Sequence, residues 1–287
     1  MANQKVSLTT SMRNNLLSLQ NTQKMMDTTQ NRLATGKKVN SAMDNPSSYF
    51  TAQSLSTRAD DLNTLMDSMG QAVQSLTAID HTIGSLTTFA QQLKSIVNSA
   101  QDTGAGDERT TYMNQFNDVI DQMDEMVNNS DGGYKGINLS KSTESLTVKF
   151  NEQSGGALSK LVIQGVDLSS ASGLGIDKLS NPTSTEDWND SSNGTTNMQD
   201  SLDQVETAIK SLRTTASNFA QNLAIVQNRQ DFTKNMINTL TAGADALTLA
   251  DMNEEAANML ALQVRQQLGT NSLSMAAQSQ QSVLSLF

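Results

Sequence analysis

The chain has 287 residues, no Cys, two Pro, one His (His81) and a formal net charge of −10. Such a charge argues against a nucleic-acid-binding protein, and the lack of Cys excludes disulfides, thiol nucleophiles and Cys-based metal sites. No apolar run approaches the roughly 18 residues that a membrane-spanning helix needs. Few Pro with many Ala, Gln, Leu and Met favour long helices, so we expect a mainly α-helical protein that needs no cofactor or metal.

The first predicted element is an amphipathic helix over residues 12–33. Met12, Leu19, Met26 and Leu33 recur every seven residues, but the positions between them, Leu16, Gln23 and Gln30, are mostly polar. The apolar face is therefore too small for this helix to fold alone. The surrounding residues 1–40 carry six Lys or Arg and one acid, Asp27, and they lack the apolar core of a secretory signal.

A turn follows this helix. Gly36 fits a helix C-cap, with Lys37 and Lys38 complementing the helix dipole, and the same turn would then act as a joint between domains. Asp44 and Pro46 mark the restart of helix, because Pro is favoured in a first turn. We therefore expect an inter-domain turn at Gly36, Asp44 and Pro46.

Two more helices are predicted before the middle of the chain. The first has apolar residues at Met66, Met69, Val73, Leu76, Ile83, Leu86, Ala90, Leu93, Val97 and Ala100. Its expected apolar position at Asp80 is flanked by Ile79 and His81. After a break at Gly104-Ala105-Gly106, a shorter stripe comprises Met113, Phe116, Ile120, Met123 and Val127.

The middle of the chain changes character. Leu146, Val148 and Phe150 alternate with polar residues, and Leu161 and Ile163 follow a Gly-rich loop, which predicts a β-hairpin. Residues 181–197 are polar and resemble a surface loop. If they are exposed, several hydroxyls there are candidates for O-linked sugars, although most such clusters are plain loops. These candidates are Ser184, Thr185, Ser191, Ser192, Thr195 and Thr196.

The last third carries the strictest pattern. Steps of four and three residues from Met198 to Leu247 meet only two polar positions, Gln230 and Thr233, which predicts a long coiled-coil helix. Residues 252–287 hold further apolar side chains, and residues 266–287 have no charge at all. An uncharged apolar stripe is an aggregation liability unless something buries it. We expect residues 6–33 to pair with it, and neighbouring copies to complete the burial.

No residue pattern indicates catalysis. His81 fits a surface or interface position, and Asp121, Asp124 and Glu125 fit one solvated helix face. Gly173-Leu174-Gly175 lacks the further Gly and Lys of a phosphate loop, and no nucleophile elbow is present. We therefore expect no enzyme.

Both ends of the chain resemble those of bacterial flagellins. RLATGKKVNSAMDNP over residues 32–46 resembles the N-terminal flagellin signature, while LALQVRQQLGT over residues 260–270 and QSVLSLF over residues 281–287 resemble the C-terminal one. Similarity covers about residues 1–140 and 198–287. The chain departs from the family at residues 88–96, which read TFAQQLKSI. Many flagellins carry Arg and Glu in this segment, which the vertebrate innate immune receptor recognises. Because both residue types are absent here, we expect weak activation of that receptor.

The resemblance implies a discontinuous architecture and a structural role. Residues 1–42 with 252–287 would form an inner helical domain, residues 43–134 with 198–251 a helical shell, and residues 135–197 a hairpin and loop region. The product would be an extracellular filament, exported without a cleaved signal. Inner-domain packing is expected from Met12, Leu16, Leu19, Met26, Leu33, Leu260, Val264, Leu268, Leu284, Leu286 and Phe287.

The implied partners are identical or sister flagellins, an export chaperone, and hook-associated junction and cap proteins, with neither nucleic acid nor membrane insertion. Residues 1–40 and 252–287 are expected to stay disordered until copies bury them, and contacts that do not close into a ring generate a helical filament. The basic N-terminal arm would pair with acids of adjacent subunits, which makes assembly salt-sensitive. The alternatives are a hook–filament junction protein of the same family, a chemoreceptor-like signalling hairpin, and an enzyme inserted in the middle.

Overall fold

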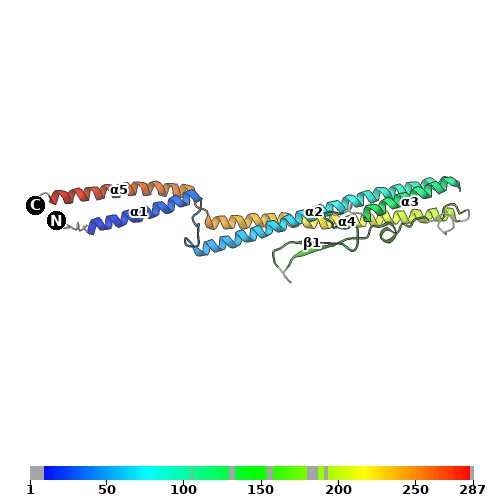
Figure 1. Cartoon of the computed structure of the whole chain (residues 1–287), viewed down its shortest axis with the longest axis horizontal. Helices are drawn as coiled ribbons and strands as arrows, with labels where there is room; N and C mark the ends of the chain where they lie inside the picture. Colours follow the sequence, from blue (N-terminus) through cyan, green and yellow to red (C-terminus); the bar gives the residue numbers. More distant parts are fainter. Residues whose placement is uncertain are drawn as a thin grey trace. The chain divides into compact units, whose positions relative to one another are not determined.

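A computed structural model describes residues 10–104, 106–128, 133–153, 158–179, 187–190 and 193–284, without the side chains of residues 280, 283 and 284. Its elements are α1 (Thr10–Thr35), α2 (Pro46–Gln101), α3 (Asp107–Asn128), β1 (Ser145–Lys149), β2 (Lys160–Gln164), the π-helix η3 (Ser170–Leu174), α4 (Gly194–Thr248) and α5 (Met252–Leu284). Figure 1 labels the five α-helices and β1. The predicted mainly α-helical fold is confirmed. In the described part of the chain, no helix is both long and apolar enough to cross a bilayer.

The chain forms two compact units. The first contains residues up to 59 together with those from 238 onward, and the second contains residues 60–237. In the first unit α1 and α5 lie side by side (Figure 1). Arg32 contacts Glu255, Gln23 contacts Gln266 and Leu19 contacts Gly269. Since the partner number falls as the α1 number rises, the two helices are antiparallel and in one register.

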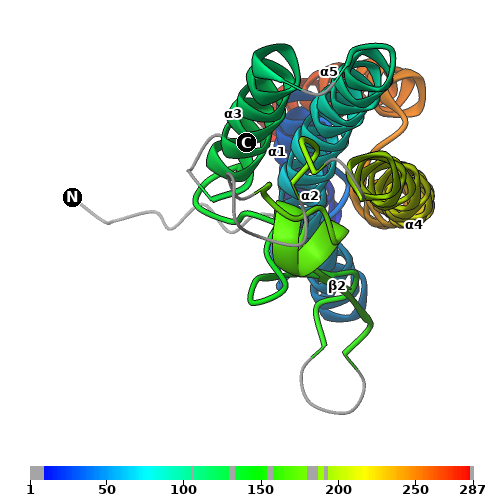
Figure 2. The same cartoon turned by 90° about the vertical axis from the view of Figure 1, so that its right-hand side faces the viewer.

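The second unit is built on α2, α3 and α4, which Figure 2 shows end-on beside the hairpin. Lys94 pairs with Glu206, and Gly70 lies next to Gln230, so α2 and α4 are also antiparallel. Every position of the predicted stripe between Met198 and Ile237 is buried or half-buried, Gln230 and Thr233 included. The long coiled-coil-like helix predicted from Met198 is thereby confirmed.

The irregularity of the α2 stripe is resolved at Ile79. Ile79 is fully buried, while Asp80 and His81 are exposed. Residues three and four positions away lie on the same helix face, so the apolar Ile79 can occupy the inward position while the carboxylate of Asp80 stays in water. The repeat therefore stays seven residues long: the step from Leu76 to the next buried residue is three instead of four, and the following step, to Ile83, is four instead of three.

The predicted hairpin is confirmed. β1 and β2 pair antiparallel with Ser145 opposite Gln164, and Leu146, Val148 and Ile163 point into the core. Phe150, just after β1, packs its ring 5.3 Å from the guanidinium carbon of Arg229 on α4. The two-stranded sheet is too small to be stable alone, so its apolar face depends on the helices.

Residues 170–179 form a strap held to α3 by side chains on one helix face. Asp124 accepts hydrogen bonds from the backbone N–H and the hydroxyl of Ser170, and Lys178 pairs with Asp121. Asn117 both donates to and accepts from the backbone of Leu179, with 2.8 Å distances. The sequence predicted a solvated face here. Glu125 is exposed, but the other carboxylates bind this strap.

The sequence pattern around Trp188 does not indicate the role of this residue. Its side chain is fully buried, packs edge-on against Phe116 at 5.3 Å, and donates its Nε1–H to Ser201 Oγ at 3.2 Å. Arg109 on α3 donates to the Trp188 carbonyl at 3.1 Å. These contacts tie residues 187–190 to α3 and α4.

Candidate self-assembly surface

One face of α5 is apolar and uncovered. Leu260, Val264, Leu268 and Met275 have relative exposures of 65%, 60%, 62% and 64%. Their spacing of four, four and seven residues places them on a single side of the helix. The opposite side of α5 faces α1, and its residues are buried or half-buried: Glu255, Met259, Leu262, Gln266, Gly269, Leu273 and Ala276. The apolar face is thus the side that α1 leaves free.

The seam between α1 and α5 is narrow and partly polar. Met12 is buried and Leu19, Met26 and Leu33 are half-buried, but the buried set on α1 also includes Thr22 and Thr29. Leu16 and Met25 are 39% and 42% exposed on α1. Of the other predicted packing residues, Leu286 and Phe287 and the side chain of Leu284 lie outside the described residues. Within its unit, each helix covers only one side of the other.

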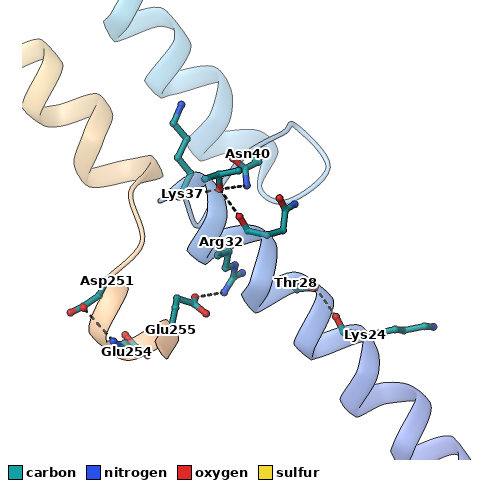
Figure 3. A network of polar contacts seen from close by, with 10 residues as sticks. Lys24, Thr28, Arg32, Lys37, Asn40, Asp251, Glu254 and Glu255 are labelled. Atoms are coloured by element: carbon teal, nitrogen blue, oxygen red, sulfur yellow. Dashed lines mark hydrogen bonds and ion pairs between the residues drawn. The ribbon is translucent and has the colours of Figure 1, made fainter. Parts of the chain in front are cut away.

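A charged pair anchors one end of this seam. Arg32 donates to Glu255 Oε1 at 2.9 Å, and the Glu255 side chain is only 9% exposed (Figure 3). The Arg32 side chain is 38% exposed, so the nearly buried Glu255 carboxylate is the charge that depends on this pairing. The pair therefore favours one register of α1 against α5.

The turn after α1 is bound to the α4–α5 connection. Gly36 has φ +69°, a left-handed conformation that favours Gly, and its N–H donates to the Arg32 carbonyl at 2.8 Å. The Gly36 carbonyl accepts from Ala250 N–H, and Lys38 N–H donates to the Thr248 carbonyl. The predicted C-cap is therefore also a backbone junction between two distant segments.

Asp44 and Pro46 complete the turn. The Asp44 carboxylate accepts hydrogen bonds from the backbone N–H groups of Asn40 and Ser41 at 2.9 and 3.0 Å. These donors stabilise the charged form and hold the pKa of Asp44 below its ordinary value. Asn45 accepts from Ser48 N–H as the N-cap of α2, and Pro46 is its first residue. The role of this turn as an inter-domain joint stays a prediction.

The candidate sugar acceptors fall in two groups. Ser184, Thr185, Ser191 and Ser192 lie outside the described residues, whereas Thr195 and Thr196 are exposed in the first turn of α4. Among the described residues, no group of three or more His, Asp or Glu side chains is placed to hold a metal ion. The geometry so far defines a helical protein whose paired terminal helices carry an unburied apolar face.

Comparison with known proteins agrees with this class. The bacterial flagellin N-terminal helical region matches residues 6–143, and the bacterial flagellin C-terminal helical region matches residues 202–287. Flagellin of Brucella melitensis biotype 1 is 28% identical over 276 residues, covering 95% of both chains. Flagellin FljK of Caulobacter vibrioides is 27% identical, covering 95% of this chain and 94% of its own. Flagellin C of Rhizobium meliloti is 22% identical, covering 91% and 92%.

The family matches span more than half of the sequence, and the chain belongs to the bacterial flagellin family. Members of this family are structural subunits that assemble into the extracellular flagellar filament, and this chain is such a subunit. The uncovered face of α5 is accordingly the candidate surface for binding copies of the chain.

Proposed function

We propose that the filament is held together at its centre by the uncovered face of α5, which copies of the same chain bury. The observation that carries this proposal is the continuous exposed row of Leu260, Val264, Leu268 and Met275 on a helix already paired along its other side. Burying a Leu or Val side chain contributes about 1.5–3 kcal/mol. Contacts of this kind repeat without closing, so they build a fibre.

The division of labour along the chain follows from this. Residues 1–42 with 252–287 serve as the inner domain, residues 43–134 with 198–251 as the surrounding helical shell, and residues 135–197 as the outward hairpin and loop region. The turn at Gly36, Asp44 and Pro46 joins the first two. Thr195 and Thr196 are the described candidates for O-linked sugars, since both are exposed.

Further partners are proposed from family membership. An export chaperone would cover the apolar ends before assembly, and hook-associated junction and cap proteins would contact the two ends of the filament. Export would proceed through the flagellar type III apparatus. A structural family supports a non-enzymatic role for this chain.

The test replaces two side chains of the exposed row with polar ones. The Leu260→Gln/Leu268→Gln double variant should raise the critical concentration for polymerisation roughly a hundredfold or more, because it removes about 3 kcal/mol of burial per subunit. The matched control is Gln263→Ala/Gln267→Ala, which alters two exposed side chains of the same helix. Sedimentation of filaments grown from wild-type seeds measures the critical concentration.

Electron microscopy of the wild-type product separates the two roles within the family. Long filaments are expected of a filament subunit, and short caps or soluble oligomers of a hook–filament junction protein. Wild-type polymer growth with equal critical concentrations for the double variant and its control would contradict the proposed surface.

A further inference from the structure

A groove beside the apolar face of α5 carries unmatched positive charge. It runs between α1 and α5, with a volume of about 540 Å³, and Lys24, Arg32, Arg265 and Glu255 are its charged lining residues. Arg32 already binds Glu255 at 2.9 Å. Lys24 and Arg265 also line the adjoining groove beside Leu17 and Ser18, so the two cations sit where both grooves meet.

The two cations lie at the same level of the helix pair. Gln23 contacts Gln266, which places Lys24 opposite Arg265 in the antiparallel register. Among the described residues, Arg265 has no hydrogen bond or ion pair, and the positions three and four residues away on α5 are Ala261, Leu262, Leu268 and Gly269. The nearby acid on α1, Asp27, accepts a hydrogen bond from Gln23. The groove therefore lacks a carboxylate of its own for Arg265.

The same unit also contains an exposed carboxylate that, among the described residues, has no positively charged partner. Glu254 is exposed in the first turn of α5, and no hydrogen bond or ion pair of its carboxylate is found among the described residues. Its neighbours three and four positions on, Ala257 and Asn258, are uncharged. Eleven residues separate Glu254 from Arg265, about 16 Å along a helix, so the two side chains of one chain do not meet.

We propose that the groove at Lys24 and Arg265 is a seat for the Glu254 carboxylate of a second copy of this chain. This inference rests on the proposed function, because burial of the α5 face between copies is what brings a second α5 alongside. An unpaired charge buried in that contact would be costly, and a carboxylate between the two cations removes the cost. The seat fixes the axial offset between neighbours, while the apolar face supplies most of the attraction.

The experiment uses two full-length variants that should fail separately and succeed together. Arg265→Glu places two carboxylates in each contact, and Glu254→Arg places like positive charges there. Each variant alone should raise the critical concentration roughly tenfold or more at low salt. An equimolar mixture should return close to the wild-type value, since alternating copies restore opposite charges in every contact. Growth is measured by sedimentation from wild-type seeds.

Matched controls make the same charge changes at exposed positions outside the groove and outside the basic N-terminal arm. Lys160→Glu on β2 and Asp245→Arg on α4 should grow like wild type, and mixing them should change nothing. The conservative Arg265→Lys variant should retain most of the growth, and added salt should weaken wild-type assembly far more than it weakens assembly of Arg265→Glu. Near-wild-type growth of Arg265→Glu alone, or failure of the mixture to recover, would overturn the seat. Failure of the wild-type chain to polymerise would instead contradict the proposed function.

Discussion

Two residues, Gly36 and Asp44, shape the turn that follows α1. Asp44 organises its turn through the backbone N–H groups of Asn40 and Ser41, and Gly36 supplies a left-handed conformation that other residues adopt at a cost of about 1 kcal/mol or more. Both residues stand inside the segment that resembles the N-terminal signature. Backbone conformation at Gly36 and hydrogen bonding at Asp44 thus account for these residue types without any contact to another subunit.

The Asp44 turn should respond to acid in a defined way. Because hydrogen bonding lowers the pKa of Asp44 from its ordinary 3.8, the carboxylate's contribution to folding is present above that value and is lost as the pH falls through the lower folded pKa. Titrating the amide signals of Asn40 and Ser41 by NMR should show one transition below pH 3.8. Asp44→Asn should abolish this transition. A midpoint at or above the ordinary value would contradict the assignment.

At the scale of elements, periodicity predicted more than side-chain chemistry did. The heptad stripe from Met198 and the alternation around Val148 were enough to predict α4 and the hairpin, because both patterns reflect one buried face. Periodicity could not show which face of α5 meets α1. Apolar residues occur on both sides of that helix, and the facing side includes Glu255, Gln266 and Gly269. Which polar residues of α5 face α1 depends on residues of α1 that lie more than 200 positions away in the sequence, such as Arg32 opposite Glu255.

The strap on α3 illustrates the same limit. Asp124 and Glu125 are adjacent acids on one helix, and nothing in their spacing distinguishes them. Only the folded chain shows that Asp124 holds Ser170, which is 1% exposed and lies 46 residues away. The contact depends on where the chain returns, so a helical pattern alone predicts a solvated face.

Removing that carboxylate should weaken the second unit. Asp124→Ala leaves the buried N–H of Ser170 without its acceptor, at a cost of about 1–3 kcal/mol in the free energy of unfolding. Glu125→Ala, which alters an exposed neighbour, should change stability by less than about 0.5 kcal/mol. Trp188 is the chain's single Trp and lies in the same unit, so its fluorescence reports denaturant unfolding directly. Equal destabilisation by the two variants would contradict the role given to the strap.

At the scale of the whole molecule, the two units differ in how completely they bury themselves. The second unit has fully buried side chains such as Phe116, Leu93 and Trp188, whereas the terminal pair relies on one narrow seam. A unit that buries little apolar surface gains little stability from its own contacts. We therefore propose that the terminal helices gain their remaining stability from other copies, and their disorder before assembly stays a prediction.

The most direct test of this account measures protection of the α5 face on polymerisation. The chain has no Cys, so single Cys residues placed at Leu260, Val264, Leu268 and Met275 can be labelled with a maleimide without background. All four should react readily in dilute subunits and be strongly protected in filaments. A Cys at the exposed Thr195 is the control, and it measures how much labelling changes on polymerisation outside the α5 face. Equal labelling of the four positions in subunits and in filaments that still form would contradict the claim that copies bury this face.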